Sequence, residues 1–108
     1  MTKVLIAEDN VLIADMLEYF LISEGFDVCG VARDVSEAVA LADLHKPDLG
    51  VFDFRLAAGE CGAHIRPRMK DPGSIGILYV SGDPLNTRLT SADGEAYKPL
   101  ASLRLISG

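Results

Sequence analysis

Short apolar runs alternate with segments of helical period along the whole chain. The runs have apolar residues on nearly successive positions, as expected for parallel strands that are covered on both faces. The segments between them repeat their apolar residues at steps of three and four, as helices do. This alternation predicts an α/β domain with a parallel sheet. We expect strands over residues 4–7, 26–32, 49–53, 75–80 and 95–97.

The first helix is predicted over residues 11–24. Its apolar residues recur at helical spacing, while Asp15, Glu18 and Ser23 fall elsewhere, so one side is expected to be buried and the other solvated. Gly25 is a typical stop signal directly after the last turn. The expected buried side consists of Leu12, Ile13, Met16, Leu17, Phe20 and Leu21.

The second helix is predicted to begin at a capping box and to end before a proline. Asp34 and Glu37 have the spacing of such a box. His45 and Lys46 stand where positive charge favours a helix end, and Pro47 prevents continuation.

The later helices are expected to be short. Gly59, Gly62 and Pro67 interrupt the segment 57–70, so we predict a short or distorted third helix. Residues 85–94 have little apolar periodicity and allow a fourth helix of one or two turns. A fifth helix is predicted from Leu100, and the sequence ends before it completes many turns, which leaves open whether the native protein continues past residue 108.

Length and composition limit the possible functions. The chain has 108 residues, 49% of them apolar, which is enough for one domain spanning residues 1–108. Its net charge of −6 argues against direct nucleic-acid binding and against anionic membranes. No apolar stretch is long enough to span a bilayer, and no secretory signal is evident, so we expect a cytoplasmic protein. Cys29 and Cys61 have neither disulfide-framework nor zinc-site spacing.

Polar residues follow the predicted strands at four places. Glu8 and Asp9 come after the first strand, Asp53 ends the third, Ser81 follows the fourth, and Lys98 follows the fifth. Because ligands of such sheets bind outside the carboxyl ends of the strands, these side chains are expected to form one site.

The chemistry of this cluster favours a cation and a phosphoryl group. Three converging carboxylates repel one another, and a hard cation such as Mg²⁺ offsets the repulsion. Asp53 is the central carboxylate and is therefore the expected nucleophile toward a metal-bound phosphoryl group. Ser81 and Lys98 would then hydrogen-bond and neutralise the phosphoryl oxygens.

Four segments in order resemble the receiver domains of two-component response regulators: VLIAEDN, PDLGVFDF, ILYVSG and YKPL. The resemblance covers essentially the whole chain and implies a flavodoxin-like, doubly wound sheet with strand order 2-1-3-4-5. It implies that Mg²⁺ is bound by Glu8, Asp9, Asp53 and the main-chain carbonyl of Arg55. It also implies that Asp53 accepts a phosphoryl group from a histidine kinase or a histidine phosphotransfer protein, and that Ser81 and Lys98 contact that group.

The chain departs from the receiver pattern at three places. The family's Pro-Gly turn after the phosphoacceptor is replaced by Ala57, Ala58 and Gly59. Glu95 stands where the family has its switch aromatic. The interval from Ser81 to Lys98 is short, which resembles a divergent subgroup with a reduced fourth helix. The resemblance further implies a cis bond between Lys98 and Pro99.

Other interpretations stay open on the sequence alone. Glu8 and Asp9 are also suited to capping the first helix. A magnesium-dependent phosphohydrolase also forms an aspartyl phosphate, but its acidic motif lies on the first strand. A pseudo-receiver would serve only as a protein-binding module. We expect a signalling domain rather than an enzyme. Such a domain would act on an unknown downstream protein or on an output domain outside this sequence.

Overall fold

The computed structural model describes residues 1–81 and 95–97, and the strands follow the predicted order. The sheet contains β1 (Lys3–Ala7), β2 (Asp27–Ala32), β3 (Leu49–Asp53), β4 (Gly76–Ser81) and β5 (Glu95–Tyr97). The helices are α1 (Val11–Ser23), α2 (Val35–His45) and α3 (Ile65–Arg68), with 3₁₀ turns η1 (Ala57–Gly59), η2 (Gly62–His64) and η3 (Pro72–Ser74).

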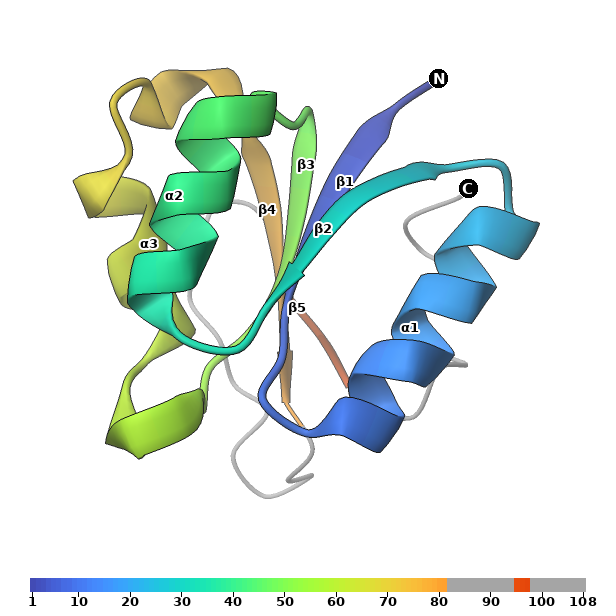
Figure 1. Ribbon diagram of the computed structural model, residues 1–108, viewed down its shortest axis with the longest axis horizontal. Helices are drawn as coiled ribbons and strands as arrows, with labels where there is room; N and C mark the ends of the chain where they lie inside the picture. The colour runs from blue at the N-terminus through green and yellow to red at the C-terminus, as the bar shows by residue number, and fades with distance from the viewer. Residues whose placement is uncertain (82–94, 98–108) are drawn as a thin grey trace.

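All neighbouring strands are parallel, and their order is β2-β1-β3-β4-β5. This order confirms the doubly wound fold that the family resemblance implies. Figure 1 shows α2 and α3 on one face of the sheet and α1 on the other. The carboxyl ends of all the strands therefore lie at one edge of the sheet, where the chain turns back toward the helices.

The sheet separates two apolar clusters. Successive residues of a strand point to opposite faces, so Val4 and Ile6 belong to the α1 side and Leu5 and Ala7 to the α2 side. The α2 side holds the larger cluster, which includes Phe52 and is closed by Ile65 of α3. Because both faces are apolar, every residue of β1 except Lys3 and every residue of β3 except Leu49 is buried.

Both long helices begin at a side-chain cap. Asn10 Oδ1 accepts a hydrogen bond from the Ile13 N–H at 3.2 Å, and Asp34 Oδ1 accepts one from the Glu37 N–H at 2.8 Å. The predicted start of α2 is thus confirmed. Capping of α1 by Glu8 and Asp9 is wrong, because Asn10 fills that position and leaves both acidic residues on the strand side of the turn.

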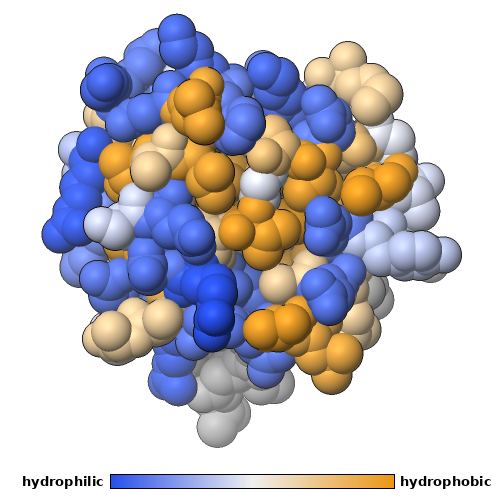
Figure 2. All heavy atoms as spheres, viewed as in Figure 1, coloured by the Kyte–Doolittle hydropathy of each residue, from blue (hydrophilic) through white to orange (hydrophobic). Residues whose placement is uncertain are grey.

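The predicted buried side of α1 is only partly correct. Leu17 and Leu21 are fully buried, but Leu12 is 70% exposed and Met16 is 46% exposed. The apolar residues of α1 cover a wider arc than one face of the sheet can contact, so the helix touches the sheet through a narrower strip that includes Ala14. Figure 2 shows apolar side chains at the molecular surface on the side where α1 lies. The large exposed apolar residues of α1 are Val11, Leu12, Met16, Tyr19 and Ile22.

The segment between β3 and β4 contains one four-residue α-helix and three 3₁₀ turns, which confirms the prediction of a short third helix. Pro67 is accommodated because α3 is too short to require its missing N–H. The predicted fourth and fifth helices lie outside the described residues. In the part of the chain that the structure describes, no helix has the length and apolarity needed to cross a membrane.

Candidate functional site

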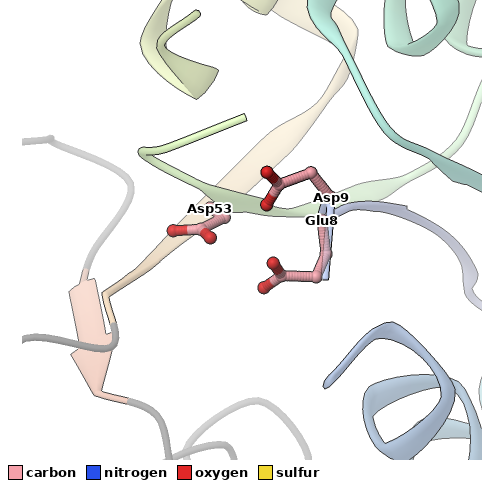
Figure 3. A group of neighbouring side chains, drawn as sticks. All are labelled: Glu8, Asp9 and Asp53. Atoms are coloured by element: carbon pink, nitrogen blue, oxygen red, sulfur yellow. The ribbon is translucent and has the colours of Figure 1, made fainter. Parts of the chain in front are cut away.

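Three carboxylates meet at the carboxyl ends of β1 and β3. The strands are neighbours, and Ala7 pairs with Phe52, so the residues that follow them come together at the sheet edge. Glu8, Asp9 and Asp53 each offer a carboxylate oxygen, and these three atoms lie within 4.8 Å of one another. Figure 3 shows Asp53 on one side and Glu8 and Asp9 on the other, with an open space between them.

The three carboxylates differ in exposure. Glu8 is 1% exposed and Asp53 is 7% exposed, whereas Asp9 is partly exposed. Glu8 Oε2 accepts a hydrogen bond from the Asn10 N–H at 3.1 Å, and Asp53 Oδ1 accepts a longer one from the Arg55 N–H at 3.3 Å. Two of the carboxylates are therefore fixed by the backbone of the turn that follows each strand.

The donor set fits a hard divalent cation. Two unit charges at 4.8 Å repel by about 3.5 kcal/mol at an effective dielectric constant near 20, and by about 0.9 kcal/mol in bulk water. Three carboxylates thus carry a repulsion that a cation removes, and ligands that are all oxygen suit Mg²⁺. The main-chain carbonyl of Arg55, which the family resemblance implies as a further ligand, belongs to the loop directly after Asp53.

The loop after Asp53 turns without the Pro-Gly pair that receivers commonly have there. The Leu56 N–H donates to the Glu60 carbonyl at 2.8 Å, which closes a tight turn. Ala58 has φ 63° and Gly59 has φ 74°. The turn therefore uses two successive left-handed residues, and one of them is an alanine, which adopts this conformation at a cost.

Gly62 permits the close approach of this loop to β3. A Cβ atom at position 62 would lie 2.0 Å from the carbonyl oxygen of Asp53, which no side chain can occupy. The Gly62 N–H also donates to the Phe54 carbonyl at 3.0 Å. The sequence indicates Gly62 only as an interruption of a helix, and no local pattern reveals this contact.

The remaining predicted site residues are only partly described. Ser81 is the last residue of β4, where its backbone pairs with Tyr97, so its position is at the same edge of the sheet as Asp53. Lys98 and Pro99 lie outside the described residues. Glu95 begins β5 and pairs with Tyr79 through the backbone.

Asp48 lies at the opposite edge of the sheet. It directly precedes β3, and its Oδ2 accepts a hydrogen bond from the Lys3 N–H at 2.9 Å. Asp48 is therefore separated from the site by the length of a strand and is not an alternative to Asp53.

Comparison with known proteins identifies the same family as the four sequence motifs. The response regulator receiver domain family matches residues 4–98. The transcriptional regulatory protein PdtaR of Mycobacterium tuberculosis is 50% identical over 54 residues, which is 50% of this chain and 26% of PdtaR. The phyllosphere-induced regulator PhyR of Methylorubrum extorquens is 34% identical over 84 residues, 77% of this chain and 32% of PhyR.

Solved structures agree with the sequence relatives. The crystal structure of the response regulator PhyR from Brucella abortus has a TM-score of 0.83 and 28% identity, and it matches 98% of this chain and 46% of that protein. The chain thus spans less than half of the length of PdtaR and of both PhyR proteins.

Proposed function

The chain belongs to the response regulator receiver family, and from this premise we propose that it accepts a phosphoryl group on Asp53 in a reaction that requires Mg²⁺. The observation that carries the proposal is the meeting of Glu8, Asp9 and Asp53 oxygens within 4.8 Å at the carboxyl edge of the sheet. Membership of the family makes the chain a signalling domain of two-component systems. The identity of the phosphoacceptor and of the metal ligands belongs to the proposal.

Asp53 is suited to act as the nucleophile because the fold holds it at the centre of the edge. Its backbone is paired within β3, and its Oδ1 is oriented by the Arg55 N–H. In the proposed step a carboxylate oxygen of Asp53 attacks the phosphorus of a phosphohistidine. The bond from phosphorus to the imidazole nitrogen breaks, and the electron pair returns to the imidazole, which takes up a proton. The product is an aspartyl phosphate.

Glu8, Asp9, Asp53 and the Arg55 carbonyl would hold the Mg²⁺. When bound, the ion neutralises the carboxylates and the phosphoryl oxygens, so that an anionic phosphodonor can approach. Glu8 can serve this purpose because it is almost fully buried and held by the Asn10 N–H. We assign Ser81 and Lys98, from their sequence positions, to the phosphoryl oxygens: the hydroxyl donates a hydrogen bond and the ammonium supplies charge.

The partner that supplies the phosphoryl group is proposed to be a histidine kinase or a histidine phosphotransfer protein. Such a partner must cover the open edge of the sheet, and α1 begins there, at Val11, two positions after Asp9. Val11 and Leu12 are 61% and 70% exposed. They give a partner an apolar surface beside the site, although the chain as a whole is acidic. The downstream output lies in another protein or in a segment outside this sequence.

Phosphorylation from a small acyl phosphate in the presence of Mg²⁺ tests the proposal. Intact mass should show one added phosphoryl group, and it should be absent when Mg²⁺ is chelated or when Asp53 is replaced in Asp53→Asn. Reduction of the acyl phosphate with borohydride marks the modified residue for peptide mapping. Asp48→Asn is the matched control, because it removes a carboxylate from the opposite edge.

Each outcome selects one interpretation. A phosphoryl group mapped to Asp48, or retained in Asp53→Asn, contradicts the assignment. Absence of any adduct with every phosphodonor, together with absence of Mg²⁺ binding, would favour a pseudo-receiver that only binds proteins. Multiple turnover of a phosphate ester would favour the phosphohydrolase.

A further inference from the structure

Glu60 lies in the loop that follows Asp53, but its side chain contacts a different element. Glu60 Oε1 accepts a hydrogen bond from the Val35 N–H at 2.9 Å, and Val35 is the first residue of α2. The first N–H groups of a helix have no acceptor within the helix, so an oxygen from another segment can satisfy one of them. Glu60 is therefore a second cap of α2, beside Asp34, which accepts from the Glu37 N–H.

Other contacts join the same loop to the start of α2. The Ala57 N–H donates to the Arg33 carbonyl at 3.1 Å. Leu56 is 3% exposed and lies in the same apolar cluster as Val35, which is 1% exposed. The loop is thus held against the start of α2 by two hydrogen bonds and by packing. The bond between Ala57 and Arg33 joins two backbones, whereas the bond to Val35 comes from the Glu60 side chain and can be removed by substitution.

The same loop determines where the Arg55 carbonyl lies. The Arg55 N–H donates to Asp53 Oδ1, and the backbone of Arg55 pairs with that of Cys61. The turn between Arg55 and Cys61 contains Ala58 at φ 63°, a conformation that an alanine leaves when nothing holds it. Release of the loop from α2 would therefore allow the turn to relax and to move the carbonyl.

We propose that Glu60 is a positioning residue of the metal site: by capping α2 it holds the loop that presents the Arg55 carbonyl beside Asp53. This inference rests on the proposed binding of Mg²⁺ at Glu8, Asp9 and Asp53. Glu60 itself does not touch the metal or the phosphoryl group. It acts through the shape of the loop, so its contribution depends on the reach of its side chain rather than on its charge.

Three variants of Glu60 separate reach from charge. Glu60→Ala removes the acceptor. Glu60→Asp keeps the charge but is one methylene shorter, so it does not reach Val35. Glu60→Gln keeps both the length and an acceptor oxygen. The matched control is Asp34→Ala, which removes the other cap of α2, the hydrogen bond from the Glu37 N–H, and leaves Glu60 in place.

The measurements are Mg²⁺ affinity, from amide chemical shifts during titration of the labelled protein with MgCl₂, and hydrogen exchange of the Val35 amide. We expect Glu60→Ala and Glu60→Asp to bind Mg²⁺ about tenfold more weakly, at the lower end of what groups that orient metal ligands contribute. Exchange at Val35 should be faster in both. Glu60→Gln should restore affinity and protection, and Asp34→Ala should keep the affinity of the unsubstituted protein.

The outcomes distinguish this proposal from the function on which it rests. If the unsubstituted protein binds no Mg²⁺, the metal site is wrong and the role of Glu60 with it. If it binds Mg²⁺ and Glu60→Ala binds equally well despite faster exchange at Val35, only the role of Glu60 is wrong. Equal weakening in Asp34→Ala would mean that α2 stability is responsible, which also overturns the proposal. If Glu60→Ala does not fold, the comparison of Glu60→Asp with Glu60→Gln decides.

Discussion

Replacement of Asp9 by asparagine should stabilise the metal-free protein, although it removes a residue of the site. Asp9 has carboxylate partners at Glu8 and Asp53, with ligand oxygens within 4.8 Å. Asparagine is nearly isosteric and uncharged, so the substitution removes two repulsive pairs and leaves the shape of the turn unchanged. Asp9 is also the most exposed of the three carboxylates, so the loss of its charge disturbs the core least.

The magnitude follows from the distance. Because Asp9 is partly exposed, the bulk-water value applies, and a distance of 4.8 Å gives about 0.9 kcal/mol for each of the two pairs. Asp9 also lies just before the start of α1, where a negative charge stabilises the helix by about 0.3–1 kcal/mol. The expected net gain in the free energy of unfolding is therefore about 1 kcal/mol at low ionic strength, and salt near 0.15 M should reduce it substantially.

Urea unfolding, with and without Mg²⁺, measures this effect. At ten times its dissociation constant, Mg²⁺ should stabilise the unsubstituted protein by about 1.4 kcal/mol. Asp9→Asn should gain less at the same concentration because a ligand is missing, so its advantage of about 1 kcal/mol should shrink, and the order of stability reverses where its own gain stays below about 0.4 kcal/mol. Asp15→Asn is the control, since it removes the same charge from an exposed position on α1. An Asp9→Asn protein that is no more stable than Asp15→Asn without Mg²⁺ would contradict the repulsion on which the metal site is argued.

Three further predictions concern single residues. Gly62→Ala should lower the free energy of unfolding by about 2 kcal/mol or more and abolish Mg²⁺ binding, because its Cβ would collide with the Asp53 carbonyl; Gly73→Ala, where nothing lies within 4 Å, should be close to neutral in the same urea titration. Ala58→Gly should raise the midpoint of urea unfolding, with a gain of about 0.5–1 kcal/mol, because φ 63° strains an alanine; an unchanged midpoint would show that the turn is unstrained. Burial raises the pKa of the Cys29 thiol above its ordinary value of 9.0, so at pH 9 Cys29 should be alkylated by iodoacetamide more slowly than free cysteine, and an equal rate measured by peptide mass would refute the burial. Because the pKa of this thiol is higher in the folded than in the unfolded chain, the free energy of unfolding should fall as the pH rises above 9.0, and the contribution of Cys29 is complete below that pH.

The strands and the two long helices could be predicted because their signals are local. The run VLIA and the cap at Asp34 depend on residues that are close in sequence, and both elements have their expected places. Convergence of Glu8 and Asp53 could also be predicted, because parallel strands end at one edge whatever the details of their packing. The burial of α1 could not, since Leu12 has helical spacing with Met16 within the expected apolar side, and both are nevertheless exposed. How much of an apolar arc is covered depends on the curvature of the sheet beneath it.

Residues that touch the reacting atoms and residues that place them leave different traces in a sequence. Glu8 and Asp53 follow apolar strands directly, so their position alone marks them. Glu60 carries no such mark: it contacts Val35 across 25 positions, and a cap that comes from another element has no characteristic spacing. Gly62 is similar, because its contact with the Asp53 carbonyl exists only when the loop closes. Sequence motifs therefore identify the ligands of a site more readily than its supports. Affinity at the proposed metal site would depend on both, so receivers with the same acidic residues can differ in how tightly they bind Mg²⁺.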